Sequence, residues 1–242
     1  MIDMHCHVMP CIDDGSKNIE ETFAIFENAA TSGVTDMVMT PHYIKGTKYC
    51  YNNQSKQQIL EVLREGIKRI GLDINIYYGN EVYIDPELPE LVKNGEVATL
   101  AGSKYLLLEL PVASEDIAAG NIIFKLKAMG ITPIIAHPER YNYIQRHPER
   151  VQKYINLGCL LQGDYMSLLG RYGHKAQKTL KMLLKYNKIA LLASDVHHAE
   201  HDYRLPEAYK KTKMITRSQK KVQELFIDNP EKIINNEEIK LD

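Results

Sequence analysis

His5 and His7 stand two residues apart in the sequence, and Asp14 follows closely. Side chains of a strand alternate between its two faces, so a strand here would place Asp3, His5 and His7 on one face. Cys6 would then point to the packed face. Two imidazoles that project together are suited to a metal ion. Two histidines also stand close by chance in many sequences, so the hypothesis of a metal site depends on what the rest of the chain brings to the same place.

Almost every strand-like segment of the chain ends on a residue that can bind a metal. In a β/α barrel the carboxyl ends of all strands meet at one rim, where their side chains converge. One histidine at a strand end is usually an ordinary polar residue, but the repetition in strand after strand favours a single shared cause. The candidate ligands are His5, His7, Asp14, His42, Glu81, Glu109, His137, Asp195 and His197.

The elements that would position these residues are seven apolar, β-rich segments separated by helix-length stretches. The segments cover residues 2–7, 36–42, 74–82, 104–111, 131–138, 159–165 and 188–197. Near-continuous apolar runs are typical of parallel strands that are covered on both sides. The alternation of such runs with helical patterns predicts βα units and an α/β fold.

The helical pattern is clearest over residues 55–70, where apolar side chains recur at steps of three and four. Ser55 is the predicted N-cap and Gly71 the predicted C-terminal stop. Residues 19–34 and 115–130 show the same pattern.

No linker, low-complexity tract or change of composition divides the 242 residues, so residues 1–242 are predicted to form one domain, and this length is ordinary for a single β/α barrel.

The composition of the candidate ligand set predicts the metal and its chemistry. Nine ligands are too many for one ion and suit two or three, and mixed imidazole and carboxylate groups without a thiolate suit manganese, iron or zinc. Four carboxylates against three divalent cations leave a positive pocket that attracts phosphate. Adjacent metals lower the pKa of a bridging water and clamp the attacking and leaving oxygens. The set therefore predicts hydrolysis of a phosphoester.

The charge and hydropathy of the chain exclude several classes of partner. The formal net charge is −1, which argues against extended contact with nucleic acid or an anionic membrane. No apolar run approaches the roughly 20 residues that span a bilayer, and the first residues do not form a signal peptide. We expect a cytoplasmic protein in which Cys6, Cys11, Cys50 and Cys159 are free, and the basic run at 210–221 is predicted to be a solvated helix face.

Short motifs around the candidate ligands resemble the PHP superfamily, named for polymerase and histidinol phosphatase. The motifs are H-C-H at 5–7, D-D-G at 13–15, T-P-H at 40–42, G-N-E at 79–81, L-L-E-L at 107–110, A-H-P-E-R at 136–140 and S-D-V-H at 194–197. With D-D-G-S and A-H-P-E-R-Y, the chain resembles the bacterial capsule-type tyrosine phosphatases of the CpsB/YwqE kind over essentially its whole length. Ser16 departs from the pattern, because relatives often have proline there.

The resemblance implies a distorted (β/α)7 barrel, the PHP fold, with three metal ions that are commonly manganese. It implies one ion on His5, His7, Glu81 and Asp195, a second on Glu81, Glu109 and His137, and a third on Asp14, His42 and His197. It also implies that Arg140 and Arg204 bind phosphate. The implied substrate is phosphotyrosine in a protein, notably in a capsule or exopolysaccharide tyrosine autokinase.

The cysteines argue separately for a metal-borne reaction. A tyrosine phosphatase with a cysteine nucleophile needs C-x5-R, in which the arginine and the loop amides hold the phosphate that the thiolate attacks. No cysteine of this chain has arginine six residues on; Lys17 follows Cys11 and Lys56 follows Cys50 at that distance. No GxxxxGK phosphate loop occurs either.

The expected mechanism is in-line attack on phosphorus by a metal-bridging hydroxide, with Arg140 and Arg204 on the phosphoryl oxygens and no protein general acid assigned. Three alternatives remain. A histidinol phosphatase of the PHP kind would use the same metals on a small phosphomonoester. A nuclease or proofreading module would use them on a phosphodiester, which the near-neutral charge disfavours. A non-catalytic binding module in a capsule-assembly complex would not need the complete ligand set.

Overall fold

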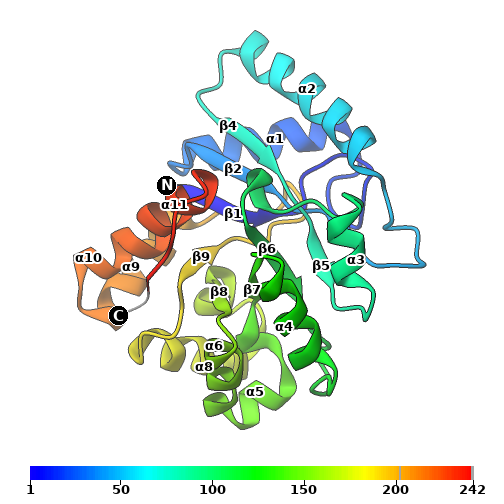
Figure 1. Ribbon diagram of the computed structural model, residues 1–242. Coiled ribbons are helices and arrows are strands. Elements are labelled where there is room, and N and C mark those ends of the chain that lie inside the picture. The colour runs from blue at the N-terminus through cyan, green and yellow to red at the C-terminus, as the bar shows by residue number, and fades with distance from the viewer. Residues whose placement is uncertain (202, 241–242) are drawn as a thin grey trace.

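The computed structural model describes residues 1–201 and 203–240, and its strands form a parallel barrel wrapped by helices (Figure 1). The strands are β1 (Ile2–Cys6), β2 (Asp36–Met39), β3 (His42–Tyr43), β4 (Asn75–Tyr78), β5 (Glu81–Tyr83), β6 (Tyr105–Glu109), β7 (Thr132–Ala136), β8 (Leu160–Asp164) and β9 (Leu191–Ala193). They coincide with the seven predicted segments, except that β3 and β5 each run one residue past the predicted end, and two of the segments are each divided into a pair of short strands. Pro41 separates β2 from β3, since proline cannot donate to a strand ladder, and Gly79 and Asn80 separate β4 from β5.

All strand pairs are parallel, in the orders β1-β2-β4 and β3-β5-β6-β7-β8-β9. Cys6 pairs with Val196 beyond the end of β9, and His7 N donates to Val196 O at 2.8 Å, which closes the barrel between its first and last strands. The division into two hydrogen-bonded sheets makes the barrel distorted. The predicted α/β barrel is thus confirmed.

Helices cover the outside of the barrel between successive strands (Figure 1). They are α1 (Ile19–Thr31), α2 (Asn53–Ile70), α3 (Leu88–Lys93), α4 (Ala119–Ala128), α5 (Asn142–Arg146), α6 (Val151–Asn156), α7 (Tyr165–Leu169), α8 (Gly173–Lys185), α9 (Leu205–Thr216), α10 (Gln219–Gln223) and α11 (Asn229–Ile234), with 3-10 turns η1 (Leu100–Gly102), η2 (Pro138–Arg140) and η3 (Pro148–Arg150) and a π turn η4 (Glu224–Asp228). Among the described residues, no helix combines the length and apolar character that crossing a bilayer requires.

The ends of α2 test the capping predictions. Gly71 ends the helix in the left-handed conformation, with φ 69°, as predicted. The predicted N-cap was wrong: Asn52 caps the helix, and its side chain accepts a hydrogen bond from Ser55 N at 2.8 Å. Ser55 lies one turn inside the helix, because an asparagine three residues earlier already satisfies the first free amides.

The faces of β1 depart from simple alternation. Its pairing with β2 is irregular between Asp3 and Cys6. Asp3, predicted to share a face with His5 and His7, instead accepts hydrogen bonds from Ser194 Oγ at 2.5 Å and from the Tyr203 hydroxyl, so that prediction was wrong. Ile2 and Met4 pack in one hydrophobic cluster and Cys6 in the other, so the side chains change faces across this irregularity. Cys6 is buried in the packed layer, as predicted.

Candidate metal centre

Four side-chain atoms, from β1 and the residue after it, from β5 and from the turn after β9, converge at the carboxyl rim of the barrel. His5 Nε2 lies 3.1 Å from His7 Nε2. Both nitrogens lie 3.3 Å from Glu81 Oε2 and 3.2 Å from Asp195 Oδ1. The centre of a tetrahedron with edges of this length lies about 2 Å from each corner, which is the length of a metal-to-imidazole bond. All four residues are buried.

Two of these atoms, both carboxylate oxygens, face only histidine nitrogens in the described part of the chain. Glu81 Oε2 and Asp195 Oδ1 are buried and make no hydrogen bond with a described residue. A buried carboxylate oxygen without a partner is costly. A divalent cation would satisfy both oxygens together with the facing lone pairs of His5 and His7. The residues present therefore fit a metal ion.

The charges of this cluster call for cations. Burial lowers the pKa of His5 and of His7, but the carboxylates around them outweigh it and hold both pKa values well above their usual range, and a metal ion would take the place of these protons. Burial raises the pKa of Glu81 and of Asp195, but the attraction of the neighbouring His5 outweighs it and holds both pKa values well below their usual range. Burial and the nearby Arg140 guanidinium lower the pKa of His137 to about 4. Ionised carboxylates and a neutral His137 are the forms that bind metals.

Glu81 also faces a second group of ligands. His42 Nδ1 lies 3.0 Å from Glu81 Oε2, and His137 Nε2 lies 2.8 Å from Glu81 Oε1 and 4.0 Å from Glu109 Oε1. Glu109, at the end of β6, stands close enough to Glu81 and His42 for one ion to contact all three. Burial and the adjacent Glu81 carboxylate raise the pKa of Glu109 to about 7. The position of Glu81 between the two groups is that of a bridging ligand.

A third group lies at the open edge of the rim. Asp14 Oδ1 is 3.6 Å from His42 Nε2 and 3.7 Å from His197 Nε2. The His197 ring stacks on that of His7, with 4.1 Å between centroids. Asp14 is about half exposed, whereas the four residues of the first group are buried. The structure thus gathers eight of the nine predicted ligands into three groups, with His42 rather than His137 beside Glu81 and Glu109 and with His7 added to the third group. His137 contacts Glu81 and lies near Glu109 without joining a group.

Backbone strain directs two of the ligands. His137 follows β7 with φ 32° and Asp195 follows β9 with φ 51°. Residues other than glycine rarely adopt this conformation, and it costs on the order of 1–3 kcal/mol at each position. Asp195 N donates to His5 O at 2.9 Å, which holds the strained turn against β1. Both turns aim their side chains into the rim.

Two orienting residues were missed from the sequence. Asp13 Oδ2 accepts from His7 Nδ1 at 2.6 Å and from His42 N at 2.9 Å. Gln162 Oε1, on β8, lies 3.0 Å from His5 Nδ1. A partner on the second ring nitrogen fixes the tautomer and direction of a metal-binding histidine. Asp13 was visible in D-D-G, but spacing does not tell which aspartate takes which role, and a glutamine in a strand carries no signal of its own.

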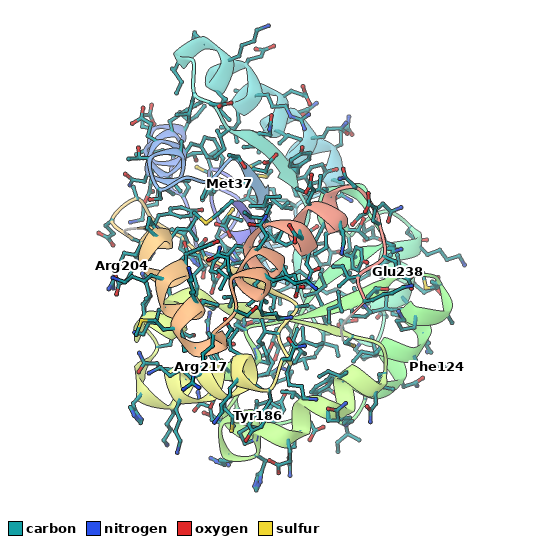
Figure 2. The ribbon with its side chains drawn as sticks, turned by 90° about the vertical axis from the view of Figure 1, so that its left-hand side faces the viewer. Met37, Phe124, Tyr186, Arg204, Arg217 and Glu238 are labelled. Atoms are coloured by element: carbon teal, nitrogen blue, oxygen red, sulfur yellow. The ribbon has the colours of Figure 1, made fainter. Side chains whose placement is uncertain are left out.

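The two predicted phosphate-binding arginines lie in different surroundings. Arg140 Nη1 pairs with Asp195 and lies 3.7 Å from Asp164 Oδ2, and its guanidinium stacks 4.3 Å from the centre of the Tyr172 ring. Arg140 therefore borders the first ligand group. Arg204 binds Glu207 through Nε at 2.9 Å and Nη2 at 2.6 Å, and it contacts no candidate ligand among the described residues. Figure 2 shows Arg204 at the outer edge of the molecule.

A parallel α/β barrel whose rim gathers histidines and carboxylates into three adjoining groups defines a metal-dependent hydrolase of the PHP kind. The chain belongs to the family described as "Capsular polysaccharide synthesis, CpsB/CapC", whose model matches residues 1–235. The resemblance found in the motifs is thus confirmed.

Relatives of known sequence and structure match over nearly the whole chain. The putative tyrosine-protein phosphatase CapC of Staphylococcus aureus is 32% identical over 243 residues, covering 99% of this chain and 93% of its own. The tyrosine-protein phosphatase CpsB of Streptococcus pneumoniae is 32% identical over 241 residues, covering 97% and 98%. A crystal structure from work on YwqE of Bacillus subtilis and CpsB of Streptococcus pneumoniae, described as unique metal-dependent tyrosine phosphatases, superposes with a TM-score of 0.93 at 25% identity, covering 100% and 97%.

Proposed function

We propose that this protein is a metal-dependent protein-tyrosine phosphatase. The observation that carries the proposal is the convergence of His5, His7, Glu81 and Asp195, in which two buried carboxylate oxygens make no hydrogen bond with a described residue. Membership of the CpsB/CapC family supports tyrosine phosphate as the substrate, since the relatives are named tyrosine-protein phosphatases.

The side chains at the rim have two roles, which are to hold metal ions and to bind the phosphate. Divalent ions held there would supply Lewis-acid charge and lower the pKa of a coordinated water. Arg140 stands at the edge of the centre with about a quarter of its side chain exposed, so its guanidinium is available to phosphoryl oxygens while Asp195 holds it in place. Arg204 would release Glu207 and bind the same phosphate. The exposed Arg204–Glu207 pair is easily broken, because an ion pair of this kind contributes only about 0–1 kcal/mol to stability.

We propose three manganese ions in this centre. The donor set is carboxylate and imidazole, with Cys6 buried away from it, and hard oxygen donors favour manganese over softer ions. Iron or zinc in the same positions is the alternative that the imidazoles permit.

The proposed partner is a phosphotyrosine protein of the capsule pathway, such as a bacterial tyrosine autokinase. The family description, capsular polysaccharide synthesis, supports this substrate class. A small phosphomonoester such as histidinol phosphate is the competing substrate, because the same centre would serve it.

The test compares three substrates after complete chelation and after return of single metals. The expected result is hydrolysis of a phosphotyrosine peptide that is lost on chelation and restored best by manganese. Preference for histidinol phosphate would support the small-molecule alternative, and cleavage of single-stranded DNA would support a nuclease. Full activity of metal-free protein, checked by elemental analysis, would overturn the proposal.

A further inference from the structure

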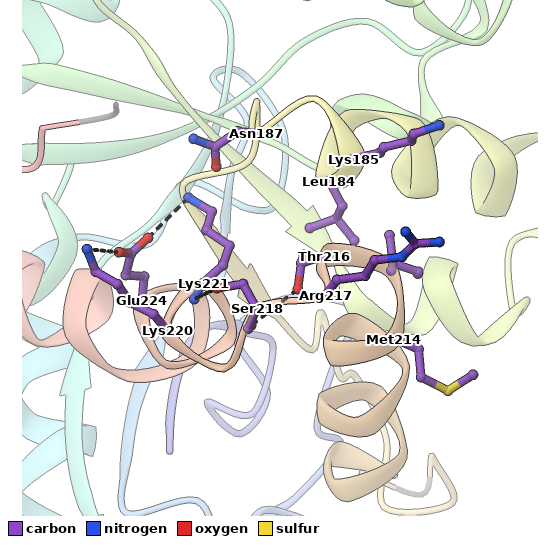
Figure 3. Close-up of a pocket in the computed structure, with 11 residues that line it drawn as sticks. Leu184, Lys185, Asn187, Met214, Thr216, Arg217, Ser218, Lys220, Lys221 and Glu224 are labelled. Atoms are coloured by element: carbon purple, nitrogen blue, oxygen red, sulfur yellow. Dashed lines mark hydrogen bonds and ion pairs between the residues drawn. The ribbon is translucent and has the colours of Figure 1, made fainter.

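A basic groove of about 680 Å³ lies between the end of α8, the end of α9 and the start of α10 (Figure 3). Leu184 and Lys185 come from α8, Met214 and Arg217 from the end of α9 and the turn after it, and Lys221 from α10. This region includes the basic run predicted as one solvated helix face. The structure divides that run at Arg217, whose φ of 53° ends α9 and turns the chain. Lys210 and Lys213 are exposed on α9, as predicted, whereas Arg217, Lys220 and Lys221 line the groove.

The charges of this groove are unbalanced. Lys185, Arg217, Lys220 and Lys221 line it, against one carboxylate, Glu224. Glu224 lies 3.7 Å from Lys220 Nζ and 3.4 Å from Lys221 Nζ. Lys185 and Arg217 have no ion-pair partner in the described part of the chain. The groove therefore carries a local positive charge in a protein whose net charge is −1.

Helix dipoles explain only part of this basic lining. Lys185 and Arg217 lie at helix carboxyl ends, where a cation is favourable without any ligand. Lys220 and Lys221 lie at the start of the helical stretch 219–234, where the positive end of the dipole opposes a cation. Glu224 supplies negative charge to these two lysines, so Lys185 and Arg217 are the cations of the groove that lack a carboxylate partner among the described residues.

An apolar pocket of about 390 Å³ adjoins the groove along α8. Its lining includes Val151, Met182, Leu183 and Tyr186. Tyr186 is 62% exposed, and Met214 on the groove side is 70% exposed. Residues 182–188 alternate between the two concavities, so the end of α8 forms the ridge between a cationic site and an apolar one.

We propose that this surface docks an acidic peptide segment that carries an aromatic or other large apolar side chain. The carboxylates of the segment would lie in the groove of Lys185 and Arg217, and its apolar side chain would enter the pocket beside Tyr186. The concave shape suits an extended peptide rather than a flat membrane. Four cations in one short groove do not form the long stripe that tracks a nucleic-acid backbone.

The docking surface lies away from the metal centre. Leu184 and Lys185 precede β9, whereas Asp195 and His197 follow it. Arg204 and Arg217 flank α9, a helix about 18 Å long, and Figure 2 shows Tyr186 beside its Arg217 end. Peptide binding and hydrolysis of a small substrate are therefore separable measurements.

Equilibrium binding of a fluorescent random copolymer of glutamate and tyrosine tests the proposal. We expect salt-sensitive binding that weakens about tenfold in the double variant Lys185→Glu/Arg217→Glu, because each exposed charge contact carries a few-fold effect and reversal doubles it. The matched control is Lys178→Glu, an exposed lysine on α8 outside both concavities. Hydrolysis of a small aryl phosphate should be unchanged in both variants, which also shows that they are folded.

A second variant separates the apolar contact from the charge. Tyr186→Ser should weaken binding of the glutamate–tyrosine copolymer but leave binding of polyglutamate unchanged. Equal affinity of wild type and the double variant, or equal loss in Lys178→Glu, would overturn the proposal. So would competitive inhibition of aryl phosphate hydrolysis by the copolymer, since it would then occupy the metal centre. Equal or tighter binding of single-stranded DNA or of phosphatidylserine vesicles to the same surface would assign it to another polyanion.

Discussion

The Asp13 carboxylate holds Nδ1 of His7 at 2.6 Å, so that Nε2 of the same ring faces the first ligand group. Asp13→Asn should weaken metal binding about 10- to 100-fold, because the ring loses the acceptor that fixes its tautomer and direction. The measurement is competition with a chromophoric chelator, with circular dichroism to confirm the fold. Asp73→Asn, at an exposed aspartate, is the control. Unchanged metal affinity in Asp13→Asn would remove the orienting role.

Glu81→Ala should lose more metal than Asp14→Ala. Glu81 belongs to the first and second groups, and its two oxygens face His42 and His137. Asp14 belongs only to the third group and is half exposed. Metal content per chain, measured by elemental analysis after identical loading, should therefore fall further in Glu81→Ala. Equal loss in the two variants, or the reverse order, would contradict a bridging role for Glu81.

Serine should replace each of the four cysteines with turnover largely kept. Cys11 and Cys50 are exposed, and their substitution should change the free energy of unfolding by less than about 0.5 kcal/mol. Cys6 and Cys159 are buried, and a hydroxyl in their place costs about 1–3 kcal/mol of stability. Chemical denaturation measures the stability, and hydrolysis of phosphotyrosine peptide measures the activity. A trapped phosphocysteine, or lost turnover in a folded variant, would contradict a metal-borne reaction.

The convergence of the candidate ligands could be predicted because parallel strands end at one rim. That rule depends only on the order of the strands, so residues as distant as His5 and Asp195 could be assigned to one site. Asp3 could not be placed, since the irregular pairing of β1 with β2 between Asp3 and Cys6 has no signal in the sequence pattern. Gln162 and Asp164 gave no signal either, because their roles depend on which neighbours β8 brings beside His5 and Arg140.

The contacts of the two arginines could not be predicted from the sequence either. Their positions after β7 and β9 follow from the sequence, but their partners do not. Arg140 is held by Asp195 and stacked on Tyr172, which comes from a segment some thirty residues further along the chain. Arg204 turns to Glu207 within its own helix start. Whether an arginine side chain pairs with a carboxylate nearby in the sequence or reaches the metal centre depends on the folded geometry, which residue spacing does not give.

Arg140→Ala should lower turnover on the order of 10²-fold or more, the cost of removing one electrostatic contact to the reacting group. The loss should be similar for phosphotyrosine peptide and for a small aryl phosphate, because the contact is to phosphoryl oxygens that both share. Metal content should be retained, since the side chain holds Asp195 Oδ2 and leaves Oδ1 to the first group. Arg140→Lys keeps the charge but not the planar fork and should recover only part of the rate.

Arg204→Ala should lower turnover on both substrates as well, if the guanidinium leaves Glu207 to reach phosphate. Glu207→Gln makes this prediction sharper, because removing the competing carboxylate frees Arg204 and should lower KM on both substrates. The stability of either variant should change by only about 0–1 kcal/mol, since the pair is exposed. The measurement is the kcat and KM of both variants with phosphotyrosine peptide and with aryl phosphate. Unchanged kinetics in both variants would leave Arg204 as a surface ion pair, and loss on the peptide alone would mean that Arg204 contacts the protein substrate rather than its phosphate.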